Sequence, residues 1–272
     1  MNDLTLRAER VRFAYEGGAW SLALEALELG RERMVCIVGP NGSGKSSLLR
    51  LLAGLADPLE GGILLDGRPL VQMSRRGIAR RIGFLPQESP SLFDFTVEDV
   101  VMMGRYVHGE GFGAVTPEDR RAVAHALDCV DIAPLRDRPL SHLSGGERRR
   151  ALIASVLAQE PELLLLDEPT AALDIHHAAA VMRLLSGFGG RQPAVVVVTH
   201  DINLASLFAE RLLLVAGGRL VADGPPAAVI TAEIMAGAYG DDLLVERHPQ
   251  TGGPLVVPVR HSGGVMPASR IG

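Results

Sequence analysis

Eight consecutive residues, Gly39-Pro40-Asn41-Gly42-Ser43-Gly44-Lys45-Ser46, match the spacing G-x-x-x-x-G-K-[ST] with nothing inserted or missing. The apolar run at 34–38 enters this stretch like a buried strand, and residues 47–52 leave it with helical spacing. Glycines let backbone N–H groups converge on a phosphate, Lys45 reaches the terminal phosphates, and the Ser46 hydroxyl can bind Mg²⁺. A plain glycine-rich turn needs neither the lysine nor the hydroxyl. The stretch therefore predicts a phosphate-binding loop.

Length and composition predict one globular unit with a subdomain. The chain has 272 residues, of which 47% are apolar, and this is ample for a large core. Its longest apolar runs have strand length, so we expect neither a membrane span nor a signal peptide. Two cysteines, Cys36 and Cys129, are too few for a disulfide framework and fit a reducing cytosol. The net charge of -5 argues against a non-specific nucleic-acid binder.

Apolar periodicity predicts a strand layer, then a helical insertion, then further strands. Residues 4–15 and 20–29 alternate as antiparallel strands do. Further strands are expected at 62–68 as an Asp-Gly hairpin, and at 82–87, 162–167, 193–199, 212–215 and 218–221. Helices are expected after the loop to about 57–58, and at 97–105, 117–130, 145–159 and 175–185. The tail after 241 has a candidate edge strand at 255–259 and a Gly/Ser/Pro-rich end that we expect to be disordered.

Polar residues that follow buried strands are candidates for catalysis. Asp167 and Glu168 follow the run 163–166, at the strand end where open α/β sheets bind ligands. Asp167 would hold Mg²⁺ and Glu168 would polarise a water; the alternative is an N-cap pair for the next helix. His200 ends the neighbouring strand and would contact the γ-phosphate, although a lone histidine is more often structural. Tyr15 either stacks on a nucleotide base or is a buried strand residue.

The segment Leu143-Ser144-Gly145-Gly146-Glu147-Arg148 looks like the signature motif of ABC-type ATPases, although Ser144 and Glu147 alone also fit an ordinary capping box. The complete set of motifs is what carries the resemblance, which covers about residues 4–240. In the order of the family's A-loop, Walker A, Q-loop, signature, Walker B, D-loop and H-loop, the chain has Tyr15, 39–46, Gln87, 143–147, 166–168, 173–174 and His200. Glu147 departs from the glutamine of many members.

The resemblance implies an α/β fold: a P-loop NTPase core with a mostly parallel sheet, an N-terminal antiparallel β-subdomain and a helical subdomain inserted at about 88–159. It implies an ATPase with ATP and Mg²⁺ as cofactors. Glu168 would be the general base, and Lys45 and His200 would be the other catalytic residues. Ser46, Gln87 and Asp167 would hold the metal. Nucleotide contacts are implied for Tyr15, Gly39, Pro40, Asn41, Gly42, Ser43, Gly44, Lys45, Ser46, Ser47 and Gln87. Ser144, Gly145, Gly146, Glu147 and Asp174 would serve the nucleotide held by a second copy.

A finer resemblance points to the ATP-binding subunits of importers. Residues 101–106, 111–113, the arginines after Glu147 and the tail at 248–259 resemble subunits for iron–siderophores first, cobalamin second and haem third. The implied partners are a second copy, membrane permease subunits and, indirectly, a substrate-binding protein, with no nucleic acid. The implied location is peripheral, on the cytoplasmic face of the inner membrane.

Two further expectations concern surfaces. Gln87 and the segment 92–95 are expected to receive a permease helix, because exposed phenylalanine needs a partner. Arg148 to Arg150 invite a nucleic-acid interpretation, but we expect one solvated helix face.

Other classes fit less well. An ABC protein of DNA repair or chromosome structure would carry a long coiled coil between Ser46 and Leu143, and the interval is too short for one. A translation factor would carry two phosphate loops, and the sequence has one. A non-catalytic nucleotide-binding scaffold would lack some catalytic positions, and all of them are filled.

Overall fold

The computed structural model describes residues 4–15, 17, 21–30, 32, 34–87, 95–109, 114–188 and 193–259. Within these residues, five apolar runs form the parallel part of the sheet. These strands are β3 (Met34–Val38), β6 (Ile82–Leu85), β7 (Leu163–Asp167), β8 (Ala194–Val198) and β9 (Arg211–Ala216). They pair in the order β9-β3-β8-β7-β6. Helices cover both faces, which explains why the runs are apolar throughout rather than alternating.

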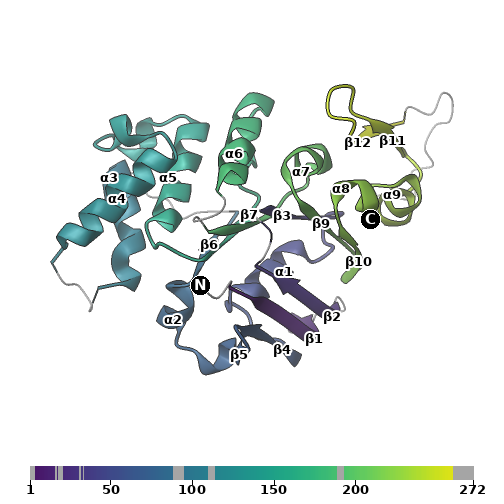
Figure 1. The fold of residues 1–272 in the computed structure, drawn as a ribbon, viewed down its shortest axis with the longest axis horizontal. Coiled ribbons are helices and arrows are strands. Elements are labelled where there is room, and N and C mark those ends of the chain that lie inside the picture. The colour runs from purple at the N-terminus through teal and green to yellow at the C-terminus, as the bar shows by residue number, and fades with distance from the viewer. Residues whose placement is uncertain are drawn as a thin grey trace.

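The remaining strands extend this sheet beyond β9, and they pair antiparallel except where β10 meets β2 (Figure 1). They are β1 (Leu6–Ala14), β2 (Ser21–Leu29), β4 (Glu60–Leu65), β5 (Arg68–Pro69) and β10 (Arg219–Gly224). Strand β10 pairs antiparallel with β9 and touches β2 through Arg219 and Ala23. Within the described residues, one ten-stranded sheet therefore joins both layers, in the order β5-β4-β1-β2-β10-β9-β3-β8-β7-β6.

Two apolar cores lie on opposite faces of the parallel strands. Alternate residues of β3 point to different sides, with Val35 and Ile37 in one core and Cys36 and Val38 in the other. Helix α1 (Lys45–Leu52) packs in the first core, together with the N-terminal strands. Helices α6 (Ile175–Gly187) and α7 (Ile202–Phe208) pack in the second. The phosphate loop is thus held between two packed layers.

Among the described residues between β6 and β7, three α-helices form the insertion, on one side of the sheet in Figure 1. They are α3 (Val97–Met103), α4 (Pro117–Cys129) and α5 (Gly145–Leu157). The other helices are α2 (Arg75–Ala79), α8 (Pro226–Val229) and α9 (Ala232–Tyr239), with 3-10 turns at Leu70–Gln72, Gly104–Val107, Ala133–Leu135 and Leu140–His142. In the described part of the chain, no helix is both long and apolar enough to span a membrane.

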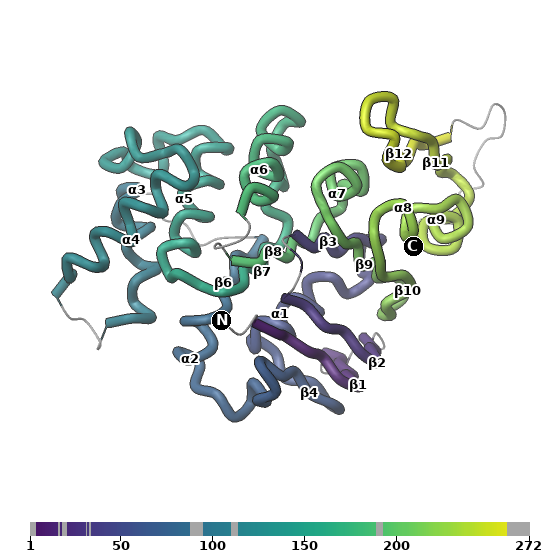
Figure 2. The backbone as a smooth tube through the Cα atoms, viewed as in Figure 1, coloured from purple at the N-terminus to yellow at the C-terminus, as the bar shows by residue number. Residues whose placement is uncertain are grey.

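Two elements differ from the sequence-based expectation. Helix α1 ends at Leu52 rather than near 57–58, because Gly54 adopts a left-handed conformation (φ +66) and the Leu55 N–H donates back to the Arg50 carbonyl at 2.9 Å. The tail strand β12 (Pro254–Pro258) pairs with β11 (Leu243–Arg247) in a separate two-stranded sheet, not with an edge of the main sheet. Figure 2 follows the chain to this yellow hairpin. The domain boundary near 240 stays a prediction, and the tail beyond 259 lies outside the described residues.

Candidate active site

The phosphate loop needs glycine at its first position for a steric reason. Gly39 has φ +153, and a Cβ there would lie 1.9 Å from the carbonyl oxygen of Val215 on β9. The loop therefore packs directly on the sheet, and α1 begins immediately after it at Lys45. The buried Ser43 Oγ has no hydrogen-bond partner within the described residues, so it is available to a phosphate oxygen.

Lys45 is bound by its own loop. Its side chain is buried, and Nζ donates to the carbonyl oxygens of Gly39 and Pro40, each at 2.8 Å. Burial lowers the pKa of Lys45, while the charges of Glu168 and Asp167 oppose that shift. The ammonium therefore sits at the centre of the loop, where phosphate charge would be stabilised most.

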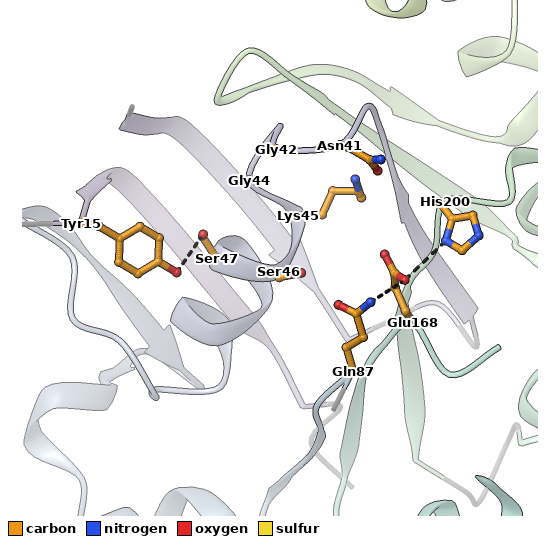
Figure 3. A pocket seen from close by; sticks show the side chains of 10 residues that line it. All are labelled: Tyr15, Asn41, Gly42, Gly44, Lys45, Ser46, Ser47, Gln87, Glu168 and His200. Carbon is orange, nitrogen blue, oxygen red and sulfur yellow. Dashed lines mark hydrogen bonds and ion pairs between the residues drawn. The ribbon is translucent and has the colours of Figure 1, made fainter. Parts of the chain in front are cut away.

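A cavity of about 820 Å³ opens above the loop (Figure 3). Its lining comes from five separate parts of the chain: Tyr15, the loop and start of α1, Gln87 after β6, Glu168 after β7, and His200 after β8. The loop and α1 contribute Asn41, Gly42, Gly44, Lys45, Ser46 and Ser47. The ends of the parallel strands β3, β6, β7 and β8 thus bring most of these distant residues to one sheet edge, and Tyr15 joins them from the end of β1.

Glu168 is the centre of the polar contacts in this cavity. One of its carboxylate oxygens accepts a hydrogen bond from Gln87 Nε2 at 3.1 Å and lies 3.4 Å from His200 Nδ1 (Figure 3). The Glu168 side chain is only 17% exposed, whereas His200 is 59% exposed. The backbone of Glu168 is left-handed, with φ 45, which is uncommon for a residue other than glycine. Such strain is found most often at functional sites.

Asp167 and Ser46 form a pair of oxygen donors suited to a hard cation. Asp167 is buried, and its Oδ1 accepts a hydrogen bond from Ser46 Oγ at 3.0 Å. Burial raises the pKa of Asp167, and the negative charge of Glu168 adds to the rise, whereas the Ser46 hydrogen bond and the charge of Lys45 lower it. A buried carboxylate held this way gains most from a bound cation, and Mg²⁺ prefers such oxygen ligands. The residues therefore fit the expected metal.

Tyr15 lies at the far end of the cavity from Glu168 (Figure 3). Its ring is half exposed, packs edge-on against Phe13 with centroids 4.9 Å apart, and its hydroxyl lies 3.2 Å from Ser47 Oγ. The alternative of a buried strand tyrosine is therefore wrong, because the ring has an open face towards the cavity.

The signature residues do not line this cavity. Ser144 caps α5, and its reciprocal capping box with Glu147 is formed. A Cβ on Gly146 would lie 2.8 Å from Cδ2 of His177, so the signature packs against the start of α6. Asp174 caps α6 and accepts from both the backbone N–H and the ring Nδ1 of His177. The signature and Asp174 are thus neighbours of each other, apart from the chain's own phosphate loop.

The expected solvated face of Arg148 to Arg150 is wrong for Arg149. Consecutive residues of a helix point about 100° apart, so three of them cannot share one face. Arg149 is buried and donates to the backbone carbonyls of Asp167, Glu168 and Pro169 at 2.9 to 3.0 Å. The buried positions of α5 include 146, 149, 153 and 157, a helical spacing that would have revealed Arg149.

The expected permease groove is described only in part. Gln87 belongs to the cavity, and Phe95 is 43% exposed, but residues 92–94 lie outside the described residues, as do 111–113. This groove stays a prediction.

The motifs and their arrangement match a known family model. The model is described as ABC transporter, and it covers residues 25–171. This chain belongs to the ABC transporter family. As an ABC ATPase it binds and hydrolyses ATP, and the α/β fold expected from the sequence is confirmed by its structural neighbours.

Relatives of this ABC ATPase include named importer subunits. It is 41% identical to the hemin import ATP-binding protein HmuV of Nocardia farcinica, with 95% of this chain and 91% of the relative covered. It is 39% identical to the ferric enterobactin transport ATP-binding protein FepC of Escherichia coli, with 93% and 94% covered. A chain of a metal-chelate type ABC transporter, solved facing inward, superposes with TM-score 0.82 at 29% identity over 95% of this chain and 98% of that one. The chain is accordingly an importer-type ATPase subunit.

Proposed function

We propose that this ATPase powers the uptake of an iron chelate, a ferric siderophore or haem, through a membrane permease. The observation that supports its catalytic part best is the strand-end carboxylate of Glu168, placed between Gln87 and His200 and facing the phosphate loop. The cargo part rests on relatives named for hemin and for ferric enterobactin. An ATPase subunit does not contact cargo, so its own site chemistry does not distinguish the two.

The proposed reaction is transfer of the γ-phosphoryl group to water. Lys45 and the backbone N–H groups of the loop bind the phosphates, and Tyr15 stacks on the base. Ser46, Asp167 and Gln87 are the residues that would hold Mg²⁺, which neutralises phosphate charge when bound. Glu168 accepts the proton of the attacking water, and His200 orients the γ-phosphate. Positioning and charge stabilisation supply most of the catalysis in reactions of this class.

A second copy completes the site. Ser144 to Glu147 and Asp174 lie outside the chain's own cavity, so they are free to face nucleotide held by a partner. A two-fold, head-to-tail pair would place two nucleotides between two copies. A bacterial ABC cassette that was solved as a dimer is 28% identical, with TM-score 0.68 over 81% of this chain and 98% of that one. The pair would lie on the cytoplasmic face of the membrane, bound to the permease, with a substrate-binding protein delivering cargo.

Glu168→Gln tests the catalytic proposal. The amide keeps nearly the same shape but cannot accept a proton, so hydrolysis should fall about 10²- to 10⁴-fold while Mg-ATP still binds. The permease-bound complex should then retain unhydrolysed ATP, measured after rapid desalting. Adding Ser144→Arg places a bulky charge in the signature and should release that nucleotide. If the double variant retained as much ATP as the single variant, the signature would not act on a partner's nucleotide.

Proteoliposomes test the cargo. The chain is purified with its native permease, reconstituted, and supplied with binding protein and either haem or a ferric siderophore. ATP-dependent uptake of one of these chelates is expected, with the Glu168→Gln complex as the inactive control. Uptake of neither, in vesicles that hydrolyse ATP, would refute the iron-chelate proposal and leave the ATPase mechanism intact.

A further inference from the structure

We propose that Arg149, on the signature helix α5, is a positioning residue that holds the backbone of Asp167 to Pro169 so that the Glu168 carboxylate faces the nucleotide cavity. The inference rests on the role proposed above for Glu168. It gives a function to a buried charge that lies outside the cavity and that the mechanism has not used.

Three hydrogen bonds join Arg149 to this segment. Its Nε donates to the Pro169 carbonyl at 2.9 Å, and one terminal nitrogen donates to the carbonyls of Asp167 and Glu168, each at 3.0 Å. All three acceptors are consecutive backbone oxygens. The planar guanidinium presents donors in a fixed fork, which suits a segment whose shape must be fixed.

The backbone that Arg149 binds is the strained part of the site. Glu168 has φ 45, a region that side chains other than glycine rarely occupy. Its N–H donates to the Val198 carbonyl on β8 at 2.9 Å, and its own carbonyl accepts from Arg149 at 3.0 Å and from the Ala171 N–H at 3.1 Å. Strained conformations persist only where the surroundings impose them. Of these three hydrogen bonds, only that of Arg149 comes from a side chain, and Arg149 also binds the carbonyls on either side of Glu168. Without Arg149, the segment loses these bonds together, and the Glu168 carboxylate can turn away from Gln87 and His200.

Charge explains why an arginine is needed here rather than a neutral donor. Burial lowers the pKa of Arg149 to about 10, and the charges of Asp167 and Glu168 oppose that shift, so the guanidinium remains positive at neutral pH. A buried cation beside two strand-end carboxylates offsets their mutual repulsion. The same side chain therefore fixes the shape of the segment and balances its charge.

The position of Arg149 also links two motifs. It lies on the helix that Ser144 caps, and the signature end of that helix packs on His177 through Gly146. A shift of α5 when the signature engages a partner's nucleotide would reach Glu168 through the three bonds of Arg149.

The first test is Arg149→Met, which removes the charge and the hydrogen-bond donors but keeps a side chain of similar volume. A displaced catalytic group commonly costs up to about 100-fold, so we expect kcat of the permease-bound ATPase to fall by about 10- to 100-fold. The Kd for ATP should stay within about twofold of the original value, because the loop and Lys45 are untouched. Arg183→Met, on the exposed face of α6, makes the same chemical change and should leave kcat and Kd unaltered. Arg149→Gln keeps an N–H donor and should recover part of the rate.

The second test is a double-mutant cycle with Glu168→Gln. If Arg149 acts by placing the Glu168 carboxylate, Arg149→Met should change the residual single-turnover hydrolysis of the Glu168→Gln protein by less than about twofold. A merely structural arginine would lower that residual rate by the same factor as in the original protein, and this result would overturn the inference, as would an unchanged kcat in Arg149→Met. Full activity in Glu168→Gln alone would instead refute the proposed function. If Arg149→Met does not fold, the same cycle with Arg149→Gln decides.

Discussion

At the scale of single residues, Lys45 is distinctive because it is the only lysine in the sequence. Its ammonium is buried and bound to the Gly39 and Pro40 carbonyls, so the loop holds the side chain in the position where it would meet phosphate. Amine chemistry on this protein therefore reports on one side chain, apart from the terminal amine.

Labelling with an amine-reactive ester tests the loop directly. We expect slow modification of Lys45, because its side chain is only 6% exposed, and further suppression by Mg-ATP. Peptide mass spectrometry measures the extent, and modification of the terminal amine serves as the internal control. Lys45→Ala should abolish hydrolysis and raise the Kd for ATP about 10- to 100-fold, the value of a charged hydrogen bond. If Mg-ATP did not slow the labelling, Lys45 would not contact the bound nucleotide.

At the scale of elements, the insertion is held together by close contact between two helices. Gly104 follows α3, and a Cβ there would lie 2.0 Å from the carbonyl oxygen of Ser155 on α5. The obstacle is backbone, which cannot move aside as a flexible side chain would. Because α5 carries the signature and Arg149, this contact also sets where those residues lie.

Gly104→Ala should therefore destabilise the protein by about 1–3 kcal/mol, the usual cost of overpacking. Gly237→Ala in α9 is the matched control, because a Cβ there meets nothing within 4 Å, and it should stabilise by up to about 1 kcal/mol. Urea unfolding gives both values. Equal effects of the two substitutions would mean that α3 and α5 are not in the close contact described.

At the scale of the whole molecule, the C-terminal hairpin is fastened to the ATPase core by α7. Asn203 donates from Nδ2 to the Val256 carbonyl at 3.0 Å and accepts from the Val256 N–H at 2.8 Å, and Ser206 Oγ donates to the Pro254 carbonyl at 2.7 Å. Helix α7 begins two residues after His200, which lines the cavity. The hairpin therefore docks on a helix that begins next to the site.

Asn203→Ala should loosen this hairpin, because both backbone groups of Val256 lose their partner. We expect a stability loss of about 1–3 kcal/mol and faster proteolysis between 240 and 259, while the rest of the chain stays protected. Ser206→Ala, which removes one bond, should have the smaller effect. Limited proteolysis followed by mass spectrometry compares the two, and cleavage spread evenly over the chain would contradict local undocking.

The phosphate loop, the strand-end carboxylates and the element order could be predicted from the sequence, because each depends on a local spacing that a strand or helix turns directly into geometry. The sequence also indicated the family, since the motifs stand in a fixed order along 4–240. The end of α1 was missed because the left-handed turn at Gly54 competes with helical periodicity. The tail strand was expected at a sheet edge, but the turn at 248–253 folds β12 back on β11, with the His248 N–H donating to the Gly253 carbonyl at 2.8 Å.

Which side chains meet in the site depends on how the strands and helices pack together. Gln87 and His200 reach one oxygen of Glu168 because β6, β7 and β8 lie side by side, and no local pattern contains that fact. The same holds for Arg149, whose charge led to the expectation of a solvent-exposed side chain. Packing of α5 against the end of β7 buries it beside three carbonyls, and hydrogen bonds to a fixed backbone compensate for the water that the guanidinium loses.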